Sequence, residues 1–231
     1  MTENNSKNTT LARNYHRLQS QLCSLTFFPP RYSSDRILAA ADRNIYYDPR
    51  NPTWCESPHW FGVVDLSPSR IASKGDRGYY IWQEGRRPIV AMEFLPPRTQ
   101  DKRPRSPGQP TAWEVYEQIL GIPFYVTFDQ ASDNLKVFRL GGDRYERQEL
   151  KNGIFWFPRL EMGLGLWRGE YRGWRRSWLR WCDSRGNLIP TPEELEAGRT
   201  EPVTRGMTKG DRSSSTLIKR LKQLGIVPDR I

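Results

Sequence analysis

Glu93 lies near the end of residues 88–95, the most apolar stretch of the chain. All the remaining side chains of this stretch are apolar. A carboxylate on a buried strand costs free energy unless a cation, a proton or hydrogen-bond donors compensate it. One such cation is a divalent metal, because Mg²⁺ and Mn²⁺ prefer oxygen ligands. Glu93 is therefore the first candidate for a catalytic or metal-binding residue. The alternative is a structural carboxylate that is protonated or paired with a buried arginine.

The charge of the chain points to an anionic partner. The sequence has 231 residues and a formal net charge of +10. Such an excess favours polyanions, above all nucleic acid, although it also fits a merely basic surface. Lysine and arginine are spread along the chain, so we expect any nucleic-acid binding to be unspecific. The nine Trp, ten Tyr and nine Phe residues need a core in which to be buried, which predicts a folded domain.

Cysteine and hydropathy patterns narrow the class of protein further. Cys23, Cys55 and Cys182 are odd in number and show no C-x-x-C spacing, which argues against a disulfide framework and a zinc site. The first ten residues are polar and do not resemble a signal peptide, and no apolar run is long enough to span a membrane. We therefore expect a cytoplasmic protein.

The chain divides into elements that position Glu93. Residues 1–10 are predicted to be a disordered arm, and the apolar spacing over 11–25 predicts an amphipathic helix. Residues 37–41 are interpreted as a short helical turn. Strands are expected at 44–48, 61–66 and 88–95. A helix over 111–120 and a strand over 123–128 then complete a βαβ unit, which requires a partly parallel sheet.

The rest of the chain is read as short antiparallel strands, followed by a tail. We expect strands within 136–140, 144–149, 154–157 and 164–179, with the Gly-Gly-Asp sequence at 141–143 as a hairpin turn. Residues 191–194 carry a cap, a proline and two acids, which is typical of a helix start. Residues 195–231 are expected to be a linker and a short C-terminal helix. We therefore expect a single domain over residues 11–194.

Several motifs recur in an order that is similar to a known family. They include Ser-Pro-His-Trp-Phe-Gly-Val-Val at 57–64, Tyr-Ile-Trp-Gln-Glu-Gly at 80–85, Ile-Val-Ala-Met-Glu-Phe-Leu at 89–95 and Gly-Asn-Leu-Ile-Pro-Thr-Pro-Glu-Glu at 186–194. The chain resembles the Uma2 family, a group of cyanobacterial proteins with a restriction-endonuclease-like fold. The resemblance implies an α/β fold: a mixed sheet flanked by helices, with a C-terminal antiparallel β-extension.

The resemblance also implies a nuclease site of the PD-(D/E)XK type, in which two acids bind Mg²⁺ or Mn²⁺ and a lysine assists. The family's second acid falls on Glu93, whereas its first acid falls on His59. The family's helix lysine falls on Ala112 or Trp113. Glu56 and Asp65 do not have the strand positions needed to replace the first acid. We therefore expect a Uma2-like endonuclease homologue with a degraded metal site that is weakly active or inactive, with Mg or Mn as cofactor if active and none otherwise.

Two further groups are candidates for binding nucleic acid or a partner protein. Trp174, Trp178 and Arg180 belong to a segment in which tryptophans alternate with arginines, which suits base stacking and phosphate contact. The same pattern fits a hairpin with one buried aromatic face. The second group is the proline-rich loop that carries Arg98, Lys102, Arg103 and Arg105. The alternative function is a non-catalytic binding or assembly subunit that uses the nuclease fold as a scaffold in a larger protein complex.

Overall fold

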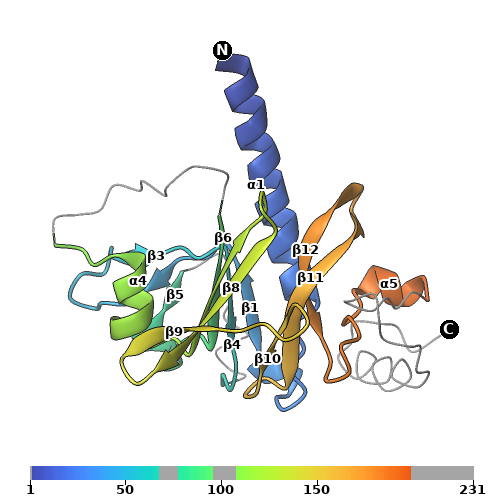
Figure 1. Cartoon of the computed structure of the whole chain (residues 1–231). Helices are drawn as coiled ribbons and strands as arrows, with labels where there is room; N and C mark the ends of the chain where they lie inside the picture. Colours follow the sequence, from blue (N-terminus) through green and yellow to red (C-terminus); the bar gives the residue numbers. More distant parts are fainter. Residues whose placement is uncertain (1, 68–77, 96–107, 199–231) are drawn as a thin grey trace.

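The computed structural model describes residues 2–67, 78–95 and 108–198, and its elements are drawn in Figure 1. The helical elements are α1 (Thr2–Leu25), η1 (Ser34–Arg36), α3 (Ile81–Glu84), α4 (Ala112–Glu114), the π-helical turn η2 (Val115–Ile119) and α5 (Pro192–Glu196). The strands are β1 (Leu38–Ala41), β2 (Ile45–Tyr46), β3 (Cys55–Glu56), β4 (Trp60–Val63), β5 (Tyr79–Tyr80), β6 (Val90–Leu95), β7 (Phe124–Asp129), β8 (Asn134–Gly141), β9 (Arg144–Gln148), β10 (Ile154–Phe157), β11 (Met162–Tyr171) and β12 (Trp174–Cys182).

The central sheet has six strands in the order β1-β4-β6-β7-β8-β9. Strands β6 and β7 are parallel, with Val90 opposite Phe124, and the chain between them passes through α4 and η2. This confirms the predicted βαβ unit. The other neighbouring pairs in this sheet are antiparallel, so the sheet is mixed. The protein is therefore an α/β protein in which strands dominate.

Two hydrophobic cores lie on the two faces of strand β6. Val90, Met92 and Phe94 are buried in a core that also contains α1 residues and the C-terminal strands. Ala91 is buried in a second core with residues of η2 and of β7. Because successive side chains of a strand point to opposite faces, an all-apolar strand between two layers satisfies both cores. Strand β6 is therefore covered on both faces as far as Phe94, with Glu93 partly exposed and Leu95 exposed.

Helix α1 packs one face on the sheet and extends further than expected. Tyr15, Leu18 and Leu22 are buried, at the helical spacing that the sequence predicted. The helix begins at Thr2, so the disordered arm predicted over residues 1–10 is not what the structure shows. Extending an anchored helix adds one backbone hydrogen bond for each residue fixed, which allows a polar segment to continue it. Figure 1 shows the first turns standing away from the sheets.

Residues 38–41 form an edge strand, whereas the sequence predicted a helical turn over 37–41. The helical turn lies just upstream, in η1, and β1 pairs with β4 so that Leu38 is opposite Val63. Three consecutive alanines favour helix intrinsically. Here backbone pairing with a buried neighbour outweighs that preference, as is common for strands.

A second sheet, β10-β11-β12, follows the central one. The segment expected over 164–179 is a hairpin of β11 and β12, and its turn residues Arg172 and Gly173 both have positive φ, 51° and 79°. Positive φ at both central positions is typical of a type I′ turn, whose twist suits a two-residue hairpin. The predicted turn at 141–143 likewise joins β8 to β9, with φ of 66° at Gly142. Both turns support the expected antiparallel extension.

The described chain ends at α5, which begins as predicted. Thr191 caps the helix in a reciprocal arrangement with Glu194, and Pro192 follows the cap.

A third, small sheet has the order β3-β2-β5. The tail expected over 195–231 lies outside the described residues from position 199 onward, so that expectation stays a prediction.

Candidate functional site

His59 and Glu93 are direct neighbours across the β4–β6 pair. Trp60 is opposite Met92 in this antiparallel pair, and the next position in the same register joins His59 to Glu93. The Nδ1 atom of His59 lies 2.8 Å from Oε2 of Glu93. The Glu93 side chain is 13% exposed, so the pair lies at the edge of the core and not deep within it. The structure therefore brings together the two residues that the sequence assigned to the site.

The end of strand β4 explains the position of the His59 ring. In the β4–β6 register the residue opposite Phe94 is Pro58, which has no backbone N–H. The pairing of β4 with β6 ends at Trp60 and Met92, and beyond it the His59 ring gives the backbone N–H of Phe94 an acceptor: its Nδ1 accepts this hydrogen bond at 3.2 Å. One ring nitrogen either accepts from Phe94 or donates to Glu93, not both at once. In either state Nδ1 is occupied by the protein's own groups.

The second oxygen of Glu93 is bound by a tyrosine from the helix after β6. Tyr116 lies in η2, is fully buried and donates its hydroxyl to Oε1 of Glu93 at 3.2 Å. The turn is π-helical: Leu120 N–H bonds to Val115 O at 2.8 Å. Such turns are rare and often mark functional positions. Burial, and then the charge of Glu93, raise the pKa of Tyr116 well above its usual value, so the hydroxyl stays a hydrogen-bond donor.

A second buried carboxyl group, that of Glu56, lies on the same side. Glu56 is 2% exposed and pairs with Ile45 in the small sheet. Its charge adds to that of Glu93 in raising the pKa of Tyr116 and of Tyr125, after the larger effect of burial. Asp65 is elsewhere and pairs with Arg36 and Arg86. Hydrogen bonds join the Glu93 carboxylate to His59 and Tyr116.

Both histidines of the chain meet at this site. The ring of His16, from α1, packs edge-on against His59 with centroids 4.7 Å apart. Burial, and then the neighbouring His59, lower the pKa of His16 to about 4. His16 is therefore neutral near pH 7. This contact connects α1 to the residue just before β4, at one end of an inner strand of the central sheet.

The donor set does not fit Mg²⁺. This ion takes oxygen ligands in near-ideal octahedral geometry. The direct neighbour of Glu93 supplies a nitrogen, and both Glu93 oxygens already accept or share hydrogen bonds. Across residues 2–67, 78–95 and 108–198, no three His, Cys, Asp or Glu side chains are grouped closely enough to hold a metal ion. The site is better described as a closed hydrogen-bonded cluster of His59, Glu93 and Tyr116.

Trp113 stands at one of the positions that the resemblance assigns to the helix lysine. Its ring packs edge-on against Tyr125, Phe138 and Tyr145, with centroids 5.2–5.6 Å away. The side chain remains 39% exposed. Trp113 therefore covers the aromatic group at the β7–β8–β9 surface, next to the Glu93 cluster, and supplies no cation to it.

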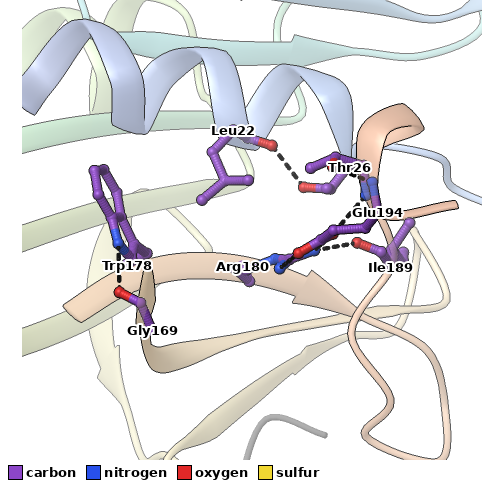
Figure 2. A network of polar contacts seen from close by, with 8 residues as sticks. Leu22, Thr26, Gly169, Trp178, Arg180, Ile189 and Glu194 are labelled. Atoms are coloured by element: carbon purple, nitrogen blue, oxygen red, sulfur yellow. Dashed lines mark hydrogen bonds and ion pairs between the residues drawn. The ribbon is translucent and has the colours of Figure 1, made fainter. Parts of the chain in front are cut away.

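The tryptophan–arginine segment is largely internal. Trp178 is fully buried and stacks on Tyr15 with centroids 4.8 Å apart. Arg180 is 1% exposed; it bonds to both oxygens of Glu194 at 2.6 Å and lies over the Trp167 ring. Figure 2 shows Trp178 and Arg180 on β12, with Glu194 reaching back to Arg180. Base stacking by Trp178 and phosphate contact by Arg180 are therefore incompatible with this structure.

Trp174 is the most accessible of these three candidates. It is half-buried at the end of the hairpin, opposite Tyr171, and the Arg176 guanidinium lies 5.6 Å from its ring centroid. The segment is a hairpin, as one interpretation of the sequence had it, but residues 178–182 of β12 are buried on both faces and not on one. The loop candidates Arg98, Lys102, Arg103 and Arg105 lie outside the described residues, so their role stays a prediction.

Three site residues were not singled out from the sequence: His16, Glu56 and, as a hydrogen-bond partner of Glu93, Tyr116. Each reaches the site from a different element. One signal was present for His16, since the chain has only two histidines and one of them already occupied the family's acid position. No local pattern marks the other two.

Comparison with known proteins adds no assignment. No protein-family model matches the chain, and no curated protein does. Among the described residues, no helix combines the length and apolar character needed to cross a lipid bilayer.

Proposed function

We propose that the protein is a Uma2-like endonuclease homologue that does not cleave nucleic acid by the metal-dependent route and works by binding. The observation that carries the proposal is the arrangement of Glu93, whose two oxygens face His59 and Tyr116 at 2.8 and 3.2 Å. A metal would have to displace at least one of these contacts, and it would then find an imidazole where a second carboxylate is needed. The restriction-endonuclease-like fold itself is part of this proposal.

The electrostatics support a binding role that is weak and unspecific. The net charge is +10, yet several exposed arginines are already paired: Arg168 with Asp133, and Arg172 with Glu193. Exposed ion pairs of this kind contribute little and exchange easily. Phosphate groups would replace the acidic partners, with release of counterions from the nucleic acid. Affinity should therefore fall steeply between about 50 and about 200 mM salt, as for other phosphate-dominated binding.

Plasmid nicking and electrophoretic mobility shifts test the two halves of this proposal. The wild-type protein should bind plasmid at low salt and leave it intact in Mg²⁺ or Mn²⁺, under conditions in which an active restriction enzyme cleaves it. Robust nicking by the wild type that is lost in Glu93→Ala would overturn the proposal. Binding that does not change with salt would show that the positive charge does not form a polyanion site.

The alternative function, an assembly subunit, has one observation in its favour. Five large apolar side chains are more than a third exposed among the described residues: Trp82, Leu95, Trp113, Ile119 and Trp156. Exposed apolar groups of this size are often found at contacts between proteins. A complex of fixed stoichiometry that is isolated from the source without nucleic acid, and that dissociates in the variant Trp156→Ser, would favour this function over nucleic-acid binding.

A further inference from the structure

The small sheet β3-β2-β5 has two chemically different faces. Across its three strands, one row consists of Glu56, Ile45 and Tyr79, and the next consists of Cys55, Tyr46 and Tyr80. All members of the first row are buried, and they face the core that contains Tyr116. The second row is only partly buried. An outward face of a sheet normally carries polar side chains, whereas this one carries two tyrosines.

These tyrosines belong to an aromatic stack outside both hydrophobic cores. The rings of Tyr46 and Tyr80 are nearly parallel, with an interplanar angle of 8° and centroids 4.5 Å apart. Trp82, in the helix α3 that directly follows β5, packs edge-to-face on Tyr80 at 5.3 Å and is 38% exposed. None of the three residues belongs to either core cluster or to the side chains packed against them. Burial in a core therefore does not explain the stack.

Gly78 lies against the Tyr46 ring of this stack. The ring of Tyr46 lies so close to Gly78 that a Cβ atom added to this glycine would be 2.2 Å from the ring. Only glycine allows the ring to approach the backbone in this way. Because one face of Tyr46 rests on Gly78 and the ring stacks on Tyr80, the order of the rings is fixed before any ligand arrives. Such preorganisation lowers the entropy cost of binding.

Positive charge lies beside the stack. Arg43 donates a hydrogen bond to the carbonyl oxygen of Gly78 at 3.4 Å, which places its guanidinium next to the Tyr46 ring. Arg86 and Arg87, in the turn that follows α3, are bound elsewhere: Arg86 pairs with Asp65, and Arg87 donates to the carbonyl oxygen of Leu120 at 3.2 Å. Aromatic rings next to guanidinium groups combine a surface for stacking with a site for phosphate. Figure 1 shows β3 and β5 beside α4, far from the C-terminal hairpin.

We propose that the outward tyrosines of the small sheet, Tyr46 and Tyr80, together with Trp82 of the adjoining α3, bind single-stranded nucleic acid by stacking bases on the exposed Trp82 ring, with Arg43 at their side. Sheets that present neighbouring aromatic rings bind single strands in this manner because an unpaired base exposes its π-face. A duplex keeps its bases stacked on one another, so this face favours single strands. The inference rests on the proposed function in one respect, namely that the protein binds nucleic acid.

Fluorescence anisotropy with labelled oligothymidylate and oligouridylate tests this inference. We expect Trp82→Ala to weaken binding about 5-fold to about 100-fold, the range for loss of one base–aromatic stack. The slope of log K against log salt should stay unchanged, because no phosphate contact is lost. Arg43→Gln should instead make the slope shallower. Trp82→Phe should restore part of the affinity because a ring remains.

The matched control is Trp156→Ala, which removes an equally exposed tryptophan (39%) from β10. It should bind like the wild type. If the wild type binds the oligonucleotides and Trp82→Ala binds equally well, the inference that bases stack on Trp82 is wrong. The proposal that the protein binds nucleic acid is then unaffected. If the wild type binds neither oligonucleotide nor duplex, both this inference and the proposed function fail. Circular dichroism of each variant shows that the fold is retained.

Discussion

The Nδ1 atom of His59 lies 2.8 Å from Oε2 of Glu93, across neighbouring strands of the central sheet. The resemblance places an acid at position 59, and two carboxylates at that spacing need a metal ion to hold them together. An imidazole at the same place needs none, because its Nδ1 either donates to Glu93 or accepts from the Phe94 N–H. With His59 at this position, protein groups alone make the hydrogen bonds to the two Glu93 oxygens.

The substitution His59→Asp reverses this change and should make stability depend on metal. Without divalent ions we expect a loss of about 1–3 kcal/mol, the cost of a poorly satisfied polar group, because two carboxylates then face each other. Mn²⁺ or Mg²⁺ should recover part of that loss by binding between them. Thermal unfolding with and without the ions measures both effects, and His59→Asn serves as the uncharged control. A melting temperature of His59→Asp that does not respond to either ion would contradict the prediction.

Local patterns predicted the elements around Glu93 well. The apolar run 88–95, the capped segment from position 111 and the apolar run 123–128 carry their own signals, and they are the strand, helix and strand of the βαβ unit. The hairpin turn at 141–143, with its positive φ at Gly142, was equally readable, whereas the turn at Arg172 and Gly173 was not predicted. These features depend on residues close together in the sequence, where periodicity and turn chemistry decide.

The contacts that complete the site could not be predicted in the same way. His16 meets His59 across 43 positions of sequence, and Tyr116 reaches Glu93 from a π-helical turn that no sequence pattern announced. The buried position of Arg180 depends on Glu194, which folds back from α5. Each of these contacts is set by tertiary packing. The same holds for β1, whose strand pairing outweighs the helix preference of its alanines.

Trp113→Lys, which introduces the family's lysine at one of its two candidate positions, should be tolerated. The ring is 39% exposed and packs edge-on on three aromatic side chains, so its loss should cost about 1–3 kcal/mol, less than the loss of a fully buried tryptophan. Chemical denaturation measures this cost. A loss above about 4 kcal/mol would show that Trp113 acts as a core residue. Activity should not appear in this variant, since the position of the first acid is still occupied by His59.

Acid should destabilise the protein partly through His16. In the unfolded chain His16 takes up a proton below about pH 6.5, whereas in the folded protein its pKa is about 4, chiefly because the ring is buried. Between these values the unfolded state binds more protons, so stability falls as the pH is lowered. Because the ring is only partly buried, we expect the loss to be about 1–2 kcal/mol. His16→Gln should remove this part of the pH dependence, measured by denaturation at pH 7 and pH 4. An identical pH dependence in wild type and variant would contradict it.

Alkali should destabilise the protein through its buried tyrosines. Burial raises the pKa of Tyr79, Tyr116 and Tyr125 above the usual value of 10.0. Above about pH 10 these groups ionise in the unfolded chain but not in the folded protein, so each lowers stability by about 1.4 kcal/mol per pH unit. Tyrosinate absorbance should then rise in two steps, with the second step coincident with unfolding. Tyr116→Phe should shift unfolding to higher pH. A single step before unfolding would show that the buried tyrosines titrate normally.

The neighbouring residues Glu193 and Glu194 offer a matched test of buried against exposed ion pairing. Glu194 bonds to Arg180, which is 1% exposed, whereas Glu193 pairs with Arg172 at the surface. Burial by itself raises the pKa of Glu194, but the hydrogen bonds and the charge of Arg180 outweigh it and lower this pKa overall. The pair therefore stabilises the protein above the usual carboxyl pKa, and this contribution is lost as the pH falls through the lowered value.

Glu194→Gln leaves the Arg180 charge buried without its counter-ion. Breaking a buried pair costs about 3–5 kcal/mol, and partial exposure of Glu194 reduces this to about 2–4 kcal/mol. Glu193→Gln should cost less than about 1 kcal/mol, as for other surface pairs. Arg180→Met combined with Glu194→Gln should recover most of the loss, because no charge then remains in the apolar site beside Trp167. Equal destabilisation by the two single glutamate variants would mean that Arg180 is hydrated in solution and that α5 is not held by this pair.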